Sequence, residues 1–94
     1  MLPPSARTWS VYVLRCAGGT LYTGITNDLE GRLKAHRAGR GAKYTRGRLP
    51  VELIHHEPAA SRGDAARRER EIKQLDRSAK LALIAAKSRS RVTF

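Results

Sequence analysis

β-branched and aromatic residues are concentrated in three short segments of the chain. Residues 9–16 and 20–25 are rich in them, and Ala17-Gly18-Gly19 between the two segments supplies a turn, so together they are predicted to form a β-hairpin. Residues 51–57, which follow Pro50, are predicted to be a third strand. Short strands that follow one another closely favour an antiparallel sheet.

A first helix is predicted directly after the hairpin. Asn27, followed three residues later by Glu30, forms a capping-box pattern, and the helix is expected to run to about Ala38, where Gly39 ends it. Residues 39–50 are then predicted to form a basic loop that Pro50 closes.

Two further helices are predicted in the C-terminal half. One spans residues 65–75 after the cap Asp64, and the other runs from the cap Ser78 to about residue 87. The order β-β-α-β-α-α indicates the α+β class, with a small three-stranded antiparallel sheet flanked by three helices. A chain of 94 residues fits one domain. The expected parts are a flexible leader over residues 1–8, the domain over residues 9–87 and a flexible tail over residues 88–94.

The register of the hairpin decides which tyrosines share a face of the sheet. A three-residue loop pairs Tyr12 with Gly24 and places Tyr12 and Tyr22 on the same face, whereas a two-residue loop at Gly18-Gly19 places them on opposite faces. A glycine opposite Tyr12 would leave open space above the sheet for the close approach of another group. Each tyrosine alone is also typical of an ordinary strand position.

Helical spacing directs three polar side chains toward the sheet. Arg32 and His36 share the face of the first predicted helix that carries Leu29 and Leu33; a histidine there is often a satisfied core residue, but an arginine needs a partner for its charge. On the next helix, Glu69 falls within the apolar stripe, so it must be paired or bind a metal ion. Spacing alone does not choose between these two roles.

The charge of the chain points to a polyanionic partner. The net charge is +11, and residues 31–50 contain seven cationic residues and no acidic one. A merely solvated basic surface is less favoured, because like-charge crowding opposes compaction unless a partner relieves it. A membrane surface is disfavoured, since no helix opposes a bulky apolar face to a lysine face.

Several other classes of protein have no support in the sequence. There is no apolar stretch long enough to span a membrane, no secretion signal and a single cysteine, Cys16, so we expect a cytoplasmic protein without a disulfide or thiolate zinc cluster. No P-loop or nucleophile-elbow motif is present. His55 and His56 are adjacent in a strand and point to opposite faces, so they cannot readily share a metal ion.

At these residues the chain resembles the GIY-YIG nuclease family. Five elements occur in the family's order: Val11-Tyr12-Val13, Tyr22-Thr23-Gly24, residues 26–36, Lys43-Tyr44-Thr45 and residues 65–73. The resemblance covers roughly residues 9–80 and is closest to small stand-alone bacterial members, which are similar to the nuclease subunit of structure-selective endonucleases. The chain departs from the family's pattern in three places. Gly-Ile does not precede Tyr12, and Thr23 stands where the family has an isoleucine. Some members use an asparagine downstream of the glutamate that corresponds to Glu69, and no asparagine follows Glu69 here.

The resemblance implies a metal-dependent endonuclease that hydrolyses phosphodiester bonds in DNA, with branched or damaged DNA in repair or recombination as the expected substrate. The implied catalytic residues are Tyr12, Tyr22, Arg32, His36 and Glu69, with Glu69 as the ligand of one Mg²⁺ or Mn²⁺. Tyr12 would deprotonate water, Arg32 would neutralise charge, and Tyr22 and His36 would orient water and phosphate. The expected nucleic-acid-binding residues are Arg40, Lys43, Tyr44, Arg46 and Arg48.

Two alternatives remain open at this stage. A non-catalytic DNA- or RNA-binding module would need the same basic surface, but it would gain nothing from Glu69 beside phosphate. A basic RNA-associated structural protein is less favoured, because aromatic residues for base stacking make up only 5% of the chain. A nuclease this small is expected to take part of its specificity from a protein partner.

Overall fold

The computed structural model describes the backbone of residues 8–92 and the side chains of residues 8–86. Its strands are β1 (Trp9–Arg15), β2 (Leu21–Thr26) and β3 (Glu52–Ala59), and they form one antiparallel sheet in the order β2-β1-β3. The helices in this part of the chain are α1 (Leu29–Arg37), α2 (Lys43–Arg46), α3 (Arg62–Gln74) and α4 (Arg77–Val92). The predicted α+β class and antiparallel sheet are confirmed.

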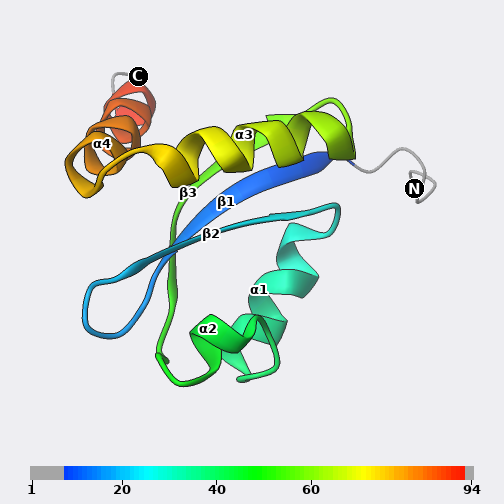
Figure 1. Ribbon diagram of the computed structural model, residues 1–94. Coiled ribbons are helices and arrows are strands. Elements are labelled where there is room, and N and C mark those ends of the chain that lie inside the picture. Colours follow the sequence, from blue (N-terminus) through cyan, green and yellow to red (C-terminus); the bar gives the residue numbers. More distant parts are fainter. Residues whose placement is uncertain (1–7, 93–94) are drawn as a thin grey trace.

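Helices cover both faces of the sheet, with α3 and α4 on one side and α1 and α2 on the other (Figure 1). On the α3 side, Val11 and Val13 of β1 pack with Ala65 and Ile72 of α3 in a buried cluster. On the α1 side, Tyr12 and Leu14 form a second cluster, against which Leu29 and Leu33 of α1 pack. The alternation of side chains along β1 therefore supplies both cores. None of the helices within residues 8–92 is long and apolar enough to cross a membrane.

The first residues of α1 and α3 differ from those predicted. The N-cap of α1 is Asp28, whose carboxylate accepts a hydrogen bond from the Gly31 amide at 3.2 Å, so the predicted cap at Asn27 is wrong by one residue. α3 begins at Arg62 because Ser61 caps it, with the Ser61 hydroxyl accepting from the Asp64 amide at 3.1 Å. Asp64 therefore lies in the first turn of the helix, where a carboxylate is favoured by the helix dipole, and is not its cap.

The predicted basic loop contains a helix, and the last helix is longer than predicted. The helix α2 lies between Gly41 and Gly47 and has no side-chain cap. Its four residues are also too few to show a hydrophobic period in the sequence. The helix α4 continues to Val92, so residues 88–92 of the predicted tail are helical. The Asp76 carboxylate accepts from the Ala79 amide at 2.8 Å near its start, in place of the predicted cap Ser78. Residues 1–7 of the predicted leader and residues 93–94 lie outside the described residues.

The hairpin has the register of the three-residue loop. Tyr12 pairs with Gly24, and Leu14 pairs with Tyr22, so Tyr12 and Tyr22 lie on the same face of the sheet. On the other side of β1, Tyr12 pairs with His56 and Val13 with His55, which places the two histidines on opposite faces as predicted.

Candidate active site

Tyr12 occupies the middle of the central strand and is only 1% exposed. Its phenol lies against the backbone of β2 at Gly24, where an added β-carbon would be 2.6 Å from the Tyr12 hydroxyl oxygen and 3.1 Å from Cε2 of Tyr22. The space above Gly24 is therefore filled by the two tyrosine rings. The expectation that this space stays open for another group is wrong, because the rings lean across the strand into it.

Three aromatic rings meet beside Gly24. The Tyr12 and Tyr22 ring centroids are 6.3 Å apart, and the His36 ring lies 5.8 Å from Tyr12 and 5.5 Å from Tyr22. Tyr22 also stacks on Tyr44 of α2, with 5.9 Å between centroids and 22° between planes. The sheet, α1 and α2 thus converge at this cluster.

His36 is fully buried and is hydrogen-bonded at both ring nitrogens. Its Nε2 lies 2.9 Å from the Tyr12 hydroxyl, and its Nδ1 lies 2.8 Å from the Thr45 hydroxyl. Burial, assisted by the positive charge of Arg32, lowers the pKa of His36 below its ordinary value of 6.5, so the ring is neutral at pH 7. Because both nitrogens are engaged, His36 is placed to act on Tyr12 rather than on water or phosphate.

Arg32 modifies the proton affinity of Tyr12. Burial is the largest influence and raises the pKa of the phenol above 10.0, while a hydrogen bond and the positive charge from Arg32 lower it. The nearby Tyr22 and Glu69 raise the pKa of Tyr12 further through their charges. Arg32 and Tyr22 are both half-buried, whereas Tyr12 is buried. The guanidinium is therefore the group that favours phenolate here.

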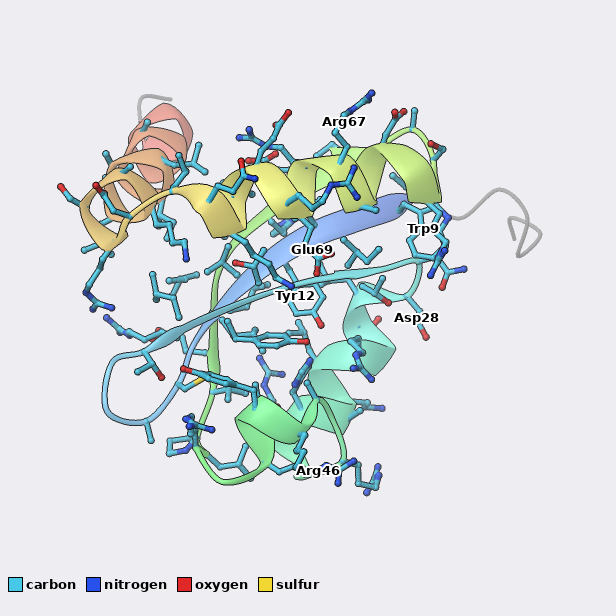
Figure 2. All side chains as sticks on the ribbon, viewed as in Figure 1. Trp9, Tyr12, Asp28, Arg46, Arg67 and Glu69 are labelled. Carbon is cyan, nitrogen blue, oxygen red and sulfur yellow. The ribbon has the colours of Figure 1, made fainter. Side chains whose placement is uncertain are left out.

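Glu69 reaches the same region from the opposite layer of the fold. It lies on α3 between the buried residues Ala65 and Ile72, and its side chain points from the helix toward Tyr12 (Figure 2). Its side chain is 22% exposed, and its carboxylate forms an i,i+4 ion pair with Lys73 at 3.2 Å. An ion pair of this kind with an exposed lysine is worth only about 0.3–0.5 kcal/mol, so it leaves the carboxylate available to a stronger cation.

The fit of a metal ion depends on this one carboxylate. Within the part of the chain that the structure describes, no three His, Cys, Asp or Glu side chains are grouped to hold a metal. Among the described residues, a metal site built from three or more protein ligands, such as structural zinc, is therefore not supported. Mg²⁺ commonly keeps several waters and binds through one or two carboxylates together with substrate phosphate, so a partly exposed single glutamate fits that ion.

The predicted nucleic-acid-binding side chains are exposed on and beside α2. Arg48 lies over the Tyr44 ring, 4.0 Å from its centroid, and also donates to the Tyr44 carbonyl. Arg46 donates from Nε to the Gly41 carbonyl at 3.3 Å. These contacts order the segment and keep its charge on the surface. The exposed residues of the set are Arg40, Lys43, Tyr44, Arg46 and Arg48.

Sequence reasoning missed two residues that support His36. Thr45 is fully buried and bonds to the ring, and Gly41 packs so closely on it that a β-carbon there would collide with Nδ1. Neither carries a periodic signal, because both lie in the segment predicted as a loop. The available signal for Thr45 was its place in the element Lys43-Tyr44-Thr45, which was noted without a role for the threonine.

Known proteins that are similar to this chain indicate one family. Residues 8–82 match the GIY-YIG catalytic domain. The chain is 57% identical over 75 residues to a UPF0213 protein of Natronomonas pharaonis, covering 80% of this chain and 88% of that one. It is 54% identical over 78 residues to a UPF0213 protein of Clostridium perfringens, covering 83% and 84% of the two chains.

A solved structure agrees with these relatives. The solution NMR structure of a UPF0213 protein from Bacillus halodurans matches with a TM-score of 0.57 and 44% identity, covering 85% of each chain. The family match includes the strands β1 and β2, which carry Tyr12 and Tyr22, and the helices α1 and α3. The chain therefore belongs to the GIY-YIG family and is similar to its small members.

Proposed function

We propose that this chain is an endonuclease that hydrolyses phosphodiester bonds in DNA at the tyrosine face of the sheet. The observation that carries the proposal is the environment of Tyr12: a buried phenol bonded to the neutral His36, beside the Arg32 guanidinium, with the Glu69 carboxylate directed toward it. A module that only bound nucleic acid would gain nothing from this arrangement, because a carboxylate repels phosphate.

Tyr12 is proposed as the group that takes a proton from the attacking water. It can do so only after losing its own proton, and His36 Nε2 is the neutral acceptor in contact with its hydroxyl at 2.9 Å. Because the pKa of Tyr12 is raised and that of His36 is lowered, this transfer needs positive charge beside the phenolate, which Arg32 and a metal ion on Glu69 would supply. The phenolate then accepts a proton from water, the water oxygen attacks phosphorus, and the bond from phosphorus to the 3′ oxygen breaks. Because Tyr12 is 1% exposed, phosphate binding has to move part of the structure that covers it.

Arg32 and Glu69 are proposed to manage charge around that step. Arg32 neutralises charge that builds on the phosphoryl oxygens in the transition state, as a fixed cation does in a partly dry site. Glu69 would hold one Mg²⁺ or Mn²⁺, which when bound supplies positive charge for the leaving 3′ oxygen. Tyr22 orients the substrate through its place between Tyr12 and Tyr44.

The basic segment is proposed to bind the DNA backbone on either side of the scissile bond. The positive charge of this segment supports DNA as the partner, and the cleavage assay described below distinguishes DNA from RNA. We further propose that the substrate is branched or damaged DNA in repair or recombination, that a protein partner adds specificity, and that the activity is cytoplasmic. The proposed backbone-binding residues are Arg40, Lys43, Tyr44, Arg46 and Arg48.

The test is cleavage of a panel of branched DNA, linear DNA and RNA with Mg²⁺, Mn²⁺ or EDTA. Glu69→Gln keeps the shape of the side chain but removes its charge, so cleavage should fall to the EDTA background while DNA affinity is kept or rises. Glu71→Gln is the matched control, since Glu71 is exposed on the same helix and bonds Arg68 at 3.1 Å, away from the site. Undiminished cleavage by Glu69→Gln would refute the metal role, and a wild type that cuts nothing on the panel would favour the binding-module alternative.

A further inference from the structure

Thr45 is a fully buried polar residue that is hydrogen-bonded to His36 of the candidate site. Its hydroxyl is 2.8 Å from His36 Nδ1 and donates to the Ala42 carbonyl at 2.9 Å. The three groups Thr45, His36 and Tyr12 therefore form one hydrogen-bonded chain from a backbone carbonyl to the phenol.

The direction of every hydrogen bond in this chain follows from the Ala42 carbonyl. A carbonyl oxygen only accepts, so the hydrogen bond from Thr45 to the Ala42 carbonyl uses the single hydroxyl hydrogen of Thr45; the same carbonyl also accepts from the backbone amides of Thr45 and Arg46. Thr45 can then only accept from His36, which places the ring hydrogen on Nδ1. A neutral imidazole has one such hydrogen, so Nε2 carries a lone pair and accepts from the Tyr12 hydroxyl.

We propose that Thr45 is a positioning residue that holds His36 in the Nδ1–H tautomer and so makes Nε2 the acceptor of the Tyr12 proton. In the transfer, the Tyr12 O–H bond breaks and an N–H bond forms at Nε2, which leaves phenolate beside imidazolium. The opposite tautomer has no lone pair at Nε2 and cannot perform this step. The catalytic consequence rests on the proposed function, but the tautomer itself does not.

The packing around the ring supports the same assignment. His36 is 0% exposed, and Gly41 lies so close to the ring that even a β-carbon would not fit. A flip of the ring about its Cβ–Cγ bond, which would take both nitrogens away from their present partners, would need this segment to move away. Because Thr45 and Gly41 both belong to the segment around α2, docking of that segment and the protonation pattern of His36 are coupled.

The experiment is long-range ¹H–¹⁵N NMR of the histidine rings in the full chain at neutral pH, without DNA or metal. The variants are Thr45→Val, which keeps the shape but not the hydroxyl, and Thr45→Ser, which keeps the hydroxyl. Wild type and Thr45→Ser should show His36 protonated at Nδ1, whereas Thr45→Val should shift toward the Nε2–H form. A wild-type ring protonated at Nε2 would overturn the proposal without any variant.

Single-turnover cleavage and thermal unfolding on the same proteins complete the test. Thr45→Val should cleave on the order of 10- to 100-fold more slowly, as is usual when a residue orienting an active group is lost, with Thr45→Ser close to wild type. A Thr45→Val protein that stays folded, keeps the Nδ1–H form and cleaves normally refutes the role of Thr45. A wild type that cleaves nothing refutes the nuclease proposal alone, because the ring spectra still decide the tautomer.

Discussion

Replacing Gly24 with alanine is the smallest change that should disturb the candidate site. The added β-carbon would lie 2.6 Å from the hydroxyl oxygen and 2.7 Å from Cζ of Tyr12. Ordinary contacts between non-bonded heavy atoms are about 3.5–4.0 Å, so the phenol has to move by roughly 1 Å. Tyr12 is only 1% exposed and its hydroxyl is 2.9 Å from His36, so the ring cannot move by this amount without changing that hydrogen bond.

Two magnitudes follow from this displacement. Overpacking of a buried site costs about 1–3 kcal/mol, and each kcal/mol lowers Tm by about 4–8 °C in a domain of this size. A shift of about 1 Å in a reacting group costs on the order of 100-fold in rate. Gly24→Ala should therefore lower Tm measurably and reduce single-turnover cleavage far more than DNA affinity.

Gly63→Ala is the matched control for this experiment. Gly63 lies in α3, and a β-carbon added there would have the Ser61 hydroxyl as its nearest neighbour at 3.8 Å, an ordinary contact. Alanine in an unstrained helical position should raise the stability of the protein by about 0.4–1 kcal/mol and leave cleavage unchanged. A Gly24→Ala protein with wild-type Tm and cleavage would show that the two tyrosines are not held against β2 as described.

Three other changes test the rest of the fold and surface. Ile72→Ala, at a 0% exposed core position, should cost about 2–5 kcal/mol in urea denaturation, and a smaller loss would mean that α3 packs loosely. A hydrogen bond from Arg68 lowers the pKa of Glu57 below its ordinary value of 4.5. The stability that this ion pair contributes is therefore fully present above pH 4.5 and is lost as the pH falls through the pKa that Glu57 has in the folded protein. Arg68→Met should therefore be less stable than wild type at pH 7, with the difference shrinking in acid; an equal difference at pH 7 and pH 3 would contradict the ion pair. Replacing four basic residues together with alanine should reduce the steepness of log affinity against log salt concentration by up to about 3–4, because each phosphate contact contributes about 0.9. An unchanged slope would place the DNA elsewhere. Those four residues are Arg40, Lys43, Arg46 and Arg48.

Periodicity was sufficient for the elements that have a long enough repeat. The β-branched and aromatic residues of 9–16 and 20–25 and the short turn between them predicted the sheet and the hairpin but left two registers open, and the structure has the one that places Tyr12 and Tyr22 on the same face. The i,i+4 spacing on α1 placed His36 inside, and the stripe on α3 placed Glu69 nearer the sheet than Glu71. These successes have one cause, since burial of one face imposes a period that is visible in a single chain.

The remaining features depend on contacts that leave no period. The helix α2 has four residues, and the caps Asp28 and Ser61 were each displaced from the predicted residue because neighbouring side chains of the same kind could serve as well. The role of Thr45 comes from a contact with His36 nine residues earlier, and the filled space at Gly24 comes from rings on two strands. Such features are set by tertiary packing, which local propensity does not encode.

The central place of β1 has a consequence for how the site opens. Tyr12 lies between Gly24 and His56, so its backbone has a neighbouring strand on each side. Its amide should therefore exchange with deuterium only when most of the domain unfolds, whereas amides of α2, a single short helix at the surface, should exchange through local opening. The proton-transferring phenol would thus sit on the slowest-exchanging strand, while its histidine partner is steadied by a segment that can open on its own.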